Sequence, residues 1–199
     1  MRFARIVSVL LLIAMLNSVA VDRAFALAQF GSTPCSGAYS NCVQLSWSGS
    51  GTQTVCGGTT GNLAVEVDWV MAYSYTNTDT EWSRSCSDPR VRINIISAPS
   101  SGLAAWVTCP VGVATWADDP VRQCQTTYLD INSVYVNTET GDPNYLAALV
   151  CHEFGHTVGV RHPISVPGYP ATGCVKTPAT AGNWYLSADD KLNLRNTYA

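Results

Sequence analysis

Charged side chains are scarce in this sequence. Lysine, arginine, aspartate and glutamate together make up 13% of its 199 residues, about half the share that is usual in soluble domains. This scarcity excludes a coiled coil, a charge-rich scaffold and a disordered acidic chain. The formal net charge is only −3, which argues against nucleic acid or an anionic membrane surface as the partner. The apolar share of 47% is enough for one well-buried core.

An apolar run long enough to cross a bilayer is also missing. The run from Ile6 to Leu16 follows basic residues and has the length of the apolar region of a secretory signal peptide. Small residues suited to cleavage follow, and we favour cleavage after Ala26 or Ala28. An uncleaved interfacial anchor is the alternative. We therefore expect a signal peptide over residues 1–28 and one secreted, extracellular domain over residues 29–199.

Histidine and methionine are rare, with three of each, whereas cysteine is abundant, with eight. All three histidines fall between residues 152 and 162, and the last methionine is Met71. An even number of cysteines, all beyond the signal segment, indicates disulfides formed in an oxidising compartment. Cys35 and Cys42 are close enough in the chain to staple a small loop.

The first half of the mature chain predicts mainly strands and loops. Residues 29–62 are rich in glycine, serine and threonine, which is typical of loops and short strands. From Leu63 to Tyr75 the odd positions are all apolar or aromatic, and this alternation favours a strand. A helix beginning after Asn62 also fits the same residues. Further strands are expected at residues 91–95, 103–108, 111–116 and 129–136.

The clearest predicted helix begins at Asp142, followed by Pro143. Aspartate accepts hydrogen bonds from the free N–H groups of a first turn, and proline suits the first helical position. An apolar face then continues to Val158, and Gly159 can adopt the left-handed conformation that ends a helix. Residues 163–183 are rich in proline and glycine and predict irregular structure, after which Ser187 begins a last helix.

The second half of the 143–158 helix carries the chemistry. His152 and His156 are four residues apart, so both imidazoles project from one helix face and can reach one metal ion. Glu153 points beside that face, where it can accept a proton from a metal-bound water. The turn at Gly159 allows His162 to arrive as a third ligand. Three neutral nitrogens leave a fourth tetrahedral position for water, as in catalytic zinc sites.

The run from His152 to His162 resembles the long zinc-binding signature of the metzincin metallopeptidases, and HEFGH looks most like their matrixin branch. Residues 186–198 resemble the C-terminal helix of matrixins. The resemblance implies an α+β, zincin-like metallopeptidase fold. This fold has a twisted mixed sheet, an active-site helix and an irregular C-terminal subdomain that ends in a helix. It also implies that the three histidines bind zinc and that Glu153 is the general base.

One feature departs from the metzincin pattern. These enzymes have a methionine in a tight turn beneath the zinc ligands, and no methionine follows the motif here. In the corresponding segment, Lys176 or Val175 takes that position, and we favour Val175 because burying a lysine is costly. Since that turn passes beneath the helix in the family, the resemblance also predicts a disulfide between Cys151 and Cys174. Free buried thiols, or pairing with Cys109 or Cys124, are the alternatives.

The predicted function is secreted, zinc-dependent hydrolysis of peptide bonds through a zinc-bound water. The alternative is an exported zinc-binding protein with the peptidase fold and no turnover, acting as a binding module. We expect one catalytic zinc ion, a protein or peptide substrate, and a monomer with no membrane partner after signal cleavage. Calcium is a second candidate metal, with Asp118, Asp119 and Asp130 as its ligands. Trp184 and Tyr185 follow the turn region, where the related enzymes build the pocket for the residue after the cleaved bond, so the resemblance implies that role for them; the alternative is packing in the core.

Overall fold

The computed structural model describes residues 45–46, 51–114, 123–160, 173–176 and 179–198 of the chain. The expected signal peptide lies outside these residues, so its boundary stays a prediction. The same holds for the Cys35–Cys42 staple and for most of the irregular segment after the zinc motif. Within the described part of the chain, no helix is both long and apolar enough to cross a membrane.

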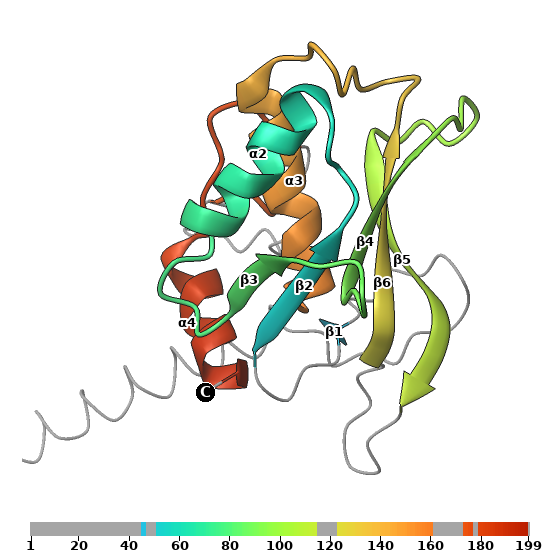
Figure 1. The fold of residues 1–199 in the computed structure, drawn as a ribbon. Helices are drawn as coiled ribbons and strands as arrows, with labels where there is room; N and C mark the ends of the chain where they lie inside the picture. Colours follow the sequence, from blue (N-terminus) through green and yellow to red (C-terminus); the bar gives the residue numbers. More distant parts are fainter. Residues whose placement is uncertain (1–44, 47–50, 115–122, 161–172, 177–178, 199) are drawn as a thin grey trace, which may run out of the picture.

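A mixed six-stranded sheet forms one layer of the fold (Figure 1). Its strands are β1 (Leu45–Ser46), β2 (Thr52–Cys56), β3 (Glu81–Arg84), β4 (Val91–Ile96), β5 (Ala105–Ala114) and β6 (Gln123–Asn132). The order β3-β2-β4-β6 is parallel throughout, and β1 pairs in parallel with the start of β6. Among the strands in the described part of the chain, only β5 is antiparallel, and it pairs with β6. This sheet, with the helices packed on it, confirms the expected α+β class.

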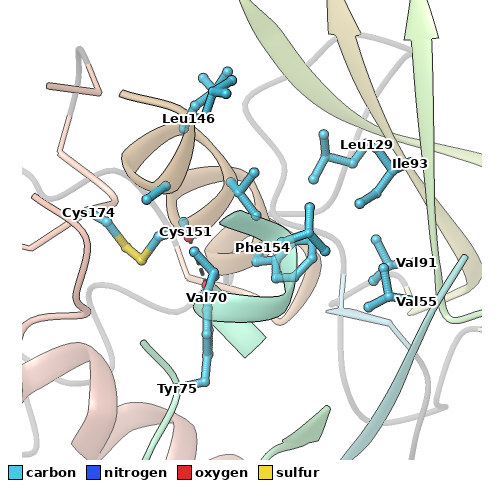
Figure 2. Close-up of a cluster of buried hydrophobic side chains, with 14 of the residues drawn as sticks. Val55, Val70, Tyr75, Val91, Ile93, Leu129, Leu146, Cys151, Phe154 and Cys174 are labelled. Atoms are coloured by element: carbon cyan, nitrogen blue, oxygen red, sulfur yellow. Dashed lines mark hydrogen bonds between the residues drawn. A yellow bond between two sulfur atoms is a disulfide. The ribbon is translucent and has the colours of Figure 1, made fainter. Parts of the chain in front are cut away.

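Helices α2 (Gly61–Tyr73) and α3 (Pro143–Thr157) lie side by side against the sheet, and α4 (Ala188–Tyr198) ends the described chain. Apolar side chains from the strands and from both helices form one core, part of which Figure 2 shows. Phe154 of α3 is fully buried and stacks on Trp82 of β3, with ring centroids 4.7 Å apart and planes 3° from parallel. Helix α3 is therefore anchored in the core by a residue within the predicted zinc motif.

The strand favoured from Leu63 to Tyr75 is wrong, and the alternative, a helix over the same residues, is confirmed, because most of them form α2. Leu63 and Val67 have no exposed surface, but Val65, which a strand would bury with them, is 63% exposed. The topology explains the result, since β2 and β3 are parallel and a parallel pair needs a crossover connection. The helix supplies that crossover, and it overrides the alternating pattern.

Two other strand predictions need correction. The segments 103–108 and 111–116 were expected as separate strands, but they form the single strand β5, with a register shift between Thr108 and Val111. Pro110 lies inside that shift and has no N–H group to donate to the ladder. β4 is observed as predicted, whereas β6 ends at Asn132 rather than at residue 136. The buried Asn132 side chain bonds the backbone of Ala98, which diverts the chain into a turn.

Candidate active site

Helix α3 begins and ends where the sequence predicts. The Asp142 side chain accepts a hydrogen bond from Asn144 N at 3.0 Å, and Pro143 is the first helical residue. At the other end Gly159 has a φ of +97°, the left-handed conformation that suits glycine. The zinc motif therefore occupies the last two turns of a helix that is capped at its start and turned sharply at its end.

The turn at Gly159 brings a backbone carbonyl back to the second histidine. Val160 N donates to the Gly155 carbonyl at 2.8 Å, which folds the chain against the helix end. The Val160 carbonyl then lies 2.7 Å from Nδ1 of His156. The glycine thus has a role beyond ending the helix, because it places the group that orients His156.

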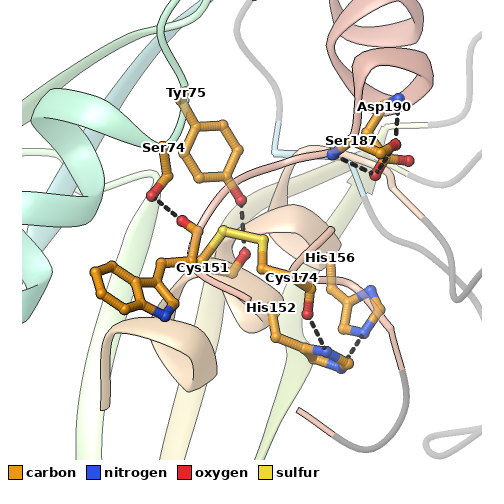
Figure 3. The surroundings of a disulfide bond; sticks show 9 residues. Ser74, Tyr75, Cys151, His152, His156, Cys174, Ser187 and Asp190 are labelled. Atoms are coloured by element: carbon orange, nitrogen blue, oxygen red, sulfur yellow. Dashed lines mark hydrogen bonds between the residues drawn. A yellow bond between two sulfur atoms is a disulfide. The ribbon is translucent and has the colours of Figure 1, made fainter. Parts of the chain in front are cut away.

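His152, the first histidine, also contacts a backbone carbonyl, which comes from a segment distant in the sequence. The turn at residues 173–176 places the Cys174 carbonyl 2.9 Å from Nδ1 of His152 (Figure 3). Cys174 itself is held by its N–H, which donates to the Tyr185 carbonyl at 2.8 Å. His152 is almost fully buried, at 6% exposed, so its ring orientation is set by these contacts.

These two contacts determine which ring nitrogen of each histidine carries the proton. A carbonyl oxygen can only accept, so in a neutral ring Nδ1 carries the hydrogen and Nε2 keeps its lone pair. The Nε2 atoms of His152 and His156 lie 3.1 Å apart, with the ring planes at 89°. Two lone pairs therefore converge on one point, an arrangement that a shared cation stabilises.

This geometry fits zinc. Two imidazole nitrogens bound tetrahedrally at about 2.0–2.1 Å lie roughly 3.3 Å apart, close to the observed separation. Zinc-bound histidines commonly donate their second ring nitrogen to a carbonyl, as both Nδ1 atoms do here. His162 falls outside the described residues, so its role as third ligand stays a prediction. Accordingly, no group of three or more potential metal ligands is found within the part of the chain that the structure describes.

Glu153 lies between the two histidines in sequence and is 4% exposed. Burial raises the pKa of its carboxyl to about 8. Its Oε2 atom is buried and has no hydrogen-bond partner among the described residues. Such an oxygen is suited to accept a proton from a molecule that enters the site, which agrees with the predicted role of general base.

Val175 occupies the buried position beneath the helix. It is 1% exposed, whereas Lys176 is partly exposed. A Cβ placed on Gly155 would lie 2.7 Å from Val175 Cγ2, so the valine packs directly on the glycine of the zinc motif. The choice of Val175 over Lys176 for the methionine position agrees with this packing.

The predicted Cys151–Cys174 disulfide is confirmed, with Cα atoms 5.8 Å apart (Figure 3). Free thiols and pairing with Cys109 or Cys124 are thereby excluded for these two cysteines. A second disulfide joins Cys56 at the end of β2 to Cys86 after β3. Both bonds agree with folding in an oxidising compartment.

The structure describes only some of the residues predicted for the calcium site and for the substrate pocket. Asp130 accepts a hydrogen bond from Asn94 at 2.8 Å, but Asp118 and Asp119 lie outside the described residues, so the calcium site stays a prediction. Trp184 and Tyr185 both meet Trp69 of α2 edge-on, with ring centroids 5.8 and 5.5 Å away. They therefore form a partly exposed aromatic cluster with α2, and their role in substrate binding is untested.

Sequence reasoning missed three groups of the site. The carbonyls of Val160 and Cys174 leave no trace in residue type, because every residue has one. Tyr75 is fully buried and donates its hydroxyl to the Cys151 carbonyl at 2.8 Å. Burial, with the nearby Asp190 and Glu153, holds the pKa of Tyr75 well above its usual value. Only a correct assignment of α2 could have placed this tyrosine against α3.

Comparison with known proteins finds likeness only at the level of structure. No family model matches the chain, and no curated protein does so either. A structure of myroilysin is 14% identical, covers 77% of this chain and 95% of its own, and has a TM-score of 0.45. High choriolytic enzyme 1, a hatching enzyme zinc-protease from the medaka fish Oryzias latipes, is 11% identical. It covers 83% of this chain and 98% of its own, with a TM-score of 0.41. Likeness this distant leaves the activity to be judged from the residues of the site.

Proposed function

We propose that this protein is a secreted zinc-dependent endopeptidase. The observation that carries the proposal is the pair of His152 and His156 Nε2 atoms, 3.1 Å apart, on the same helix as the buried Glu153 carboxyl. His152 and His156 would hold the metal, together with His162. When bound, zinc supplies a Lewis acid that polarises a carbonyl and acidifies water. The two disulfides and the predicted signal peptide support export.

Proton transfer and the orientation of the ligands would be carried out by residues of the protein. Glu153 would accept the proton of the attacking water and deliver it to the leaving amine. Glu153 follows His152 directly on the helix, and its buried Oε2 atom, with no partner among the described residues, suits that role. The Cys174 and Val160 carbonyls would keep both ligand rings in the tautomer that presents Nε2.

The substrate would be a peptide in extended conformation. Strand β5 pairs with β6 along one edge and contacts α3. Among the described strands, none pairs with the other edge of β5. That edge can add a further strand through backbone hydrogen bonds, a common way to bind extended peptides.

Two variants and one control test this function. Purified mature protein is assayed for zinc content and for casein hydrolysis, with and without a chelator. Glu153→Gln should keep one zinc ion and lose about 10²–10⁴-fold in turnover, because only the proton acceptor is removed. His156→Ala should lose the zinc, and Glu81→Gln, an exposed carboxylate on β3, should leave both properties unchanged.

The outcome also separates the two candidate functions. Zinc in the wild-type protein without hydrolysis of any peptide would favour the alternative, an exported zinc-binding module. Hydrolysis that persists in Glu153→Gln would refute the proposed mechanism. Full zinc content in His156→Ala would refute the ligand assignment.

A further inference from the structure

Two links join the start of the histidine motif on α3 to one residue, Cys174: the disulfide from Cys151 and a hydrogen bond from His152. Cys151 precedes His152 on α3, and the disulfide leads from Cys151 to Cys174. The Cys174 carbonyl then returns to Nδ1 of His152 at 2.9 Å. Both cysteines are fully buried, so these two links lie inside the protein.

The two histidines differ in how their carbonyl partners are held. Val160 is four residues from His156, and the local turn at the helix end is enough to place its carbonyl. Cys174 is 22 residues from His152 and belongs to a separate segment. A carbonyl from so distant a segment needs an anchor to stay within hydrogen-bond range, and the covalent bond to the neighbouring residue Cys151 provides one.

We infer that the Cys151–Cys174 disulfide is the positioning device of the metal centre. It fixes the Cys174 carbonyl on His152 Nδ1, and so presents the His152 Nε2 lone pair to zinc before the metal arrives. Cys174 is then a positioning residue, which acts through its backbone oxygen. The inference rests on the proposed function only for the identity of the metal.

The second disulfide offers a matched control. Cys56–Cys86 spans 30 residues and Cys151–Cys174 spans 23, so both constrain the unfolded chain to a similar degree. Cys86 is exposed, and the bond joins the end of β2 to the segment after β3. Removing it should therefore lower stability without changing the orientation of His152.

The test compares the double variants Cys151→Ala/Cys174→Ala and Cys56→Ala/Cys86→Ala in the mature chain. Zinc dissociation constants are measured by competition with a chromophoric chelator, and stability by urea unfolding. The first variant should bind zinc about 10- to 100-fold more weakly, the usual effect of losing an outer partner of a ligand. The control should stay within about twofold of wild type. Equal losses in the two variants, or no loss in the first, would overturn the inference.

A second measurement needs no variant to fold. In metal-free wild-type protein at about pH 8, where an ordinary histidine is neutral, ¹⁵N spectra of the rings report the tautomer. His152 should carry its proton on Nδ1 without zinc, and an Nε2–H tautomer would overturn the inference. If wild-type protein bound no zinc, the proposed function would fail, but this readout would still decide whether the Cys174 carbonyl holds His152 in the Nδ1–H tautomer.

Discussion

Val175 packs directly against Gly155, so the valine side chain beneath α3 occupies the space that a Cβ on the helix would need. The two atoms would lie 2.7 Å apart, far inside van der Waals contact. The glycine of the zinc motif is therefore required by its neighbour in the turn as much as by its own backbone.

Gly155→Ala should destabilise the protein by roughly 1–2 kcal/mol. Overpacking a core lowers the free energy of unfolding by about 1–3 kcal/mol, and the better helix propensity of alanine offsets up to about 1 kcal/mol of this loss. In a Val175→Ala background the clash is gone, so the same substitution should become neutral or stabilising. Urea unfolding of the four proteins measures this change of sign, and an unchanged cost in both backgrounds would contradict the packing.

Asp190 should make stability depend on pH. Burial raises its pKa to about 6, with a smaller contribution from Asp189, against hydrogen bonds from Ser187 that lower it. Because the folded pKa lies above the ordinary value of 3.8, ionisation is penalised in the folded state. Stability should therefore fall by roughly 2–3 kcal/mol as the pH rises from about 4 to above 6.

Asp190→Asn should remove most of that dependence, since the amide oxygen can still accept from Ser187. The exposed neighbour Asp189 provides the control, and Asp189→Asn should keep most of the wild-type pH dependence, because burial is the main cause of the raised pKa of Asp190. Thermal unfolding from pH 4 to 8 measures the difference between the two variants. Identical profiles would show that Asp190 is not the group responsible.

The stability of the protein should depend on the N-terminal cap of α3. Asp142→Ala removes the acceptor for Asn144 N and should cost about 1 kcal/mol. Asp142→Asn keeps an acceptor oxygen and should recover most of that loss. Equal urea midpoints for all three proteins would mean that solvent replaces the cap without cost.

Chelation should lower the unfolding temperature. Zinc that binds only the folded chain stabilises it by about 4 kcal/mol when its free concentration is roughly 1,000 times the dissociation constant. Calorimetry with and without a chelator should therefore show a clear shift for the wild type. His156→Ala, already without metal, should show none, and a shift in that variant would point to a different metal site.

The sequence predicted best those features that depend on neighbouring residues. Asp142, Pro143 and Gly159 define α3 through local backbone chemistry, and all three behave as expected. The alternation from Leu63 to Tyr75 was misleading because the parallel pairing of β2 and β3, a long-range property, decides that segment. The sequence predicted two strands in place of β5, because a proline inside a strand resembles the end of a strand.

The site shows the same division between local and long-range features. The spacing of His152 and His156 brings their ring nitrogens together, since a helix places such residues on one face. The groups that orient them are backbone carbonyls, which no residue pattern reveals. The Cys151–Cys174 pairing became predictable only through the resemblance, which places the turn beneath the helix.

Phe154 follows Glu153 directly and fills the core against Trp82. The helical turn that carries His152 and Glu153 therefore cannot open alone, because its opening would expose this ring to water. We expect the amides of residues 151–155 to exchange with solvent only when the whole domain unfolds. A peptidase with this packing would not cleave α3 in another molecule of the same protein. A protease cleaves only backbone that has unfolded locally, and α3 would not unfold locally.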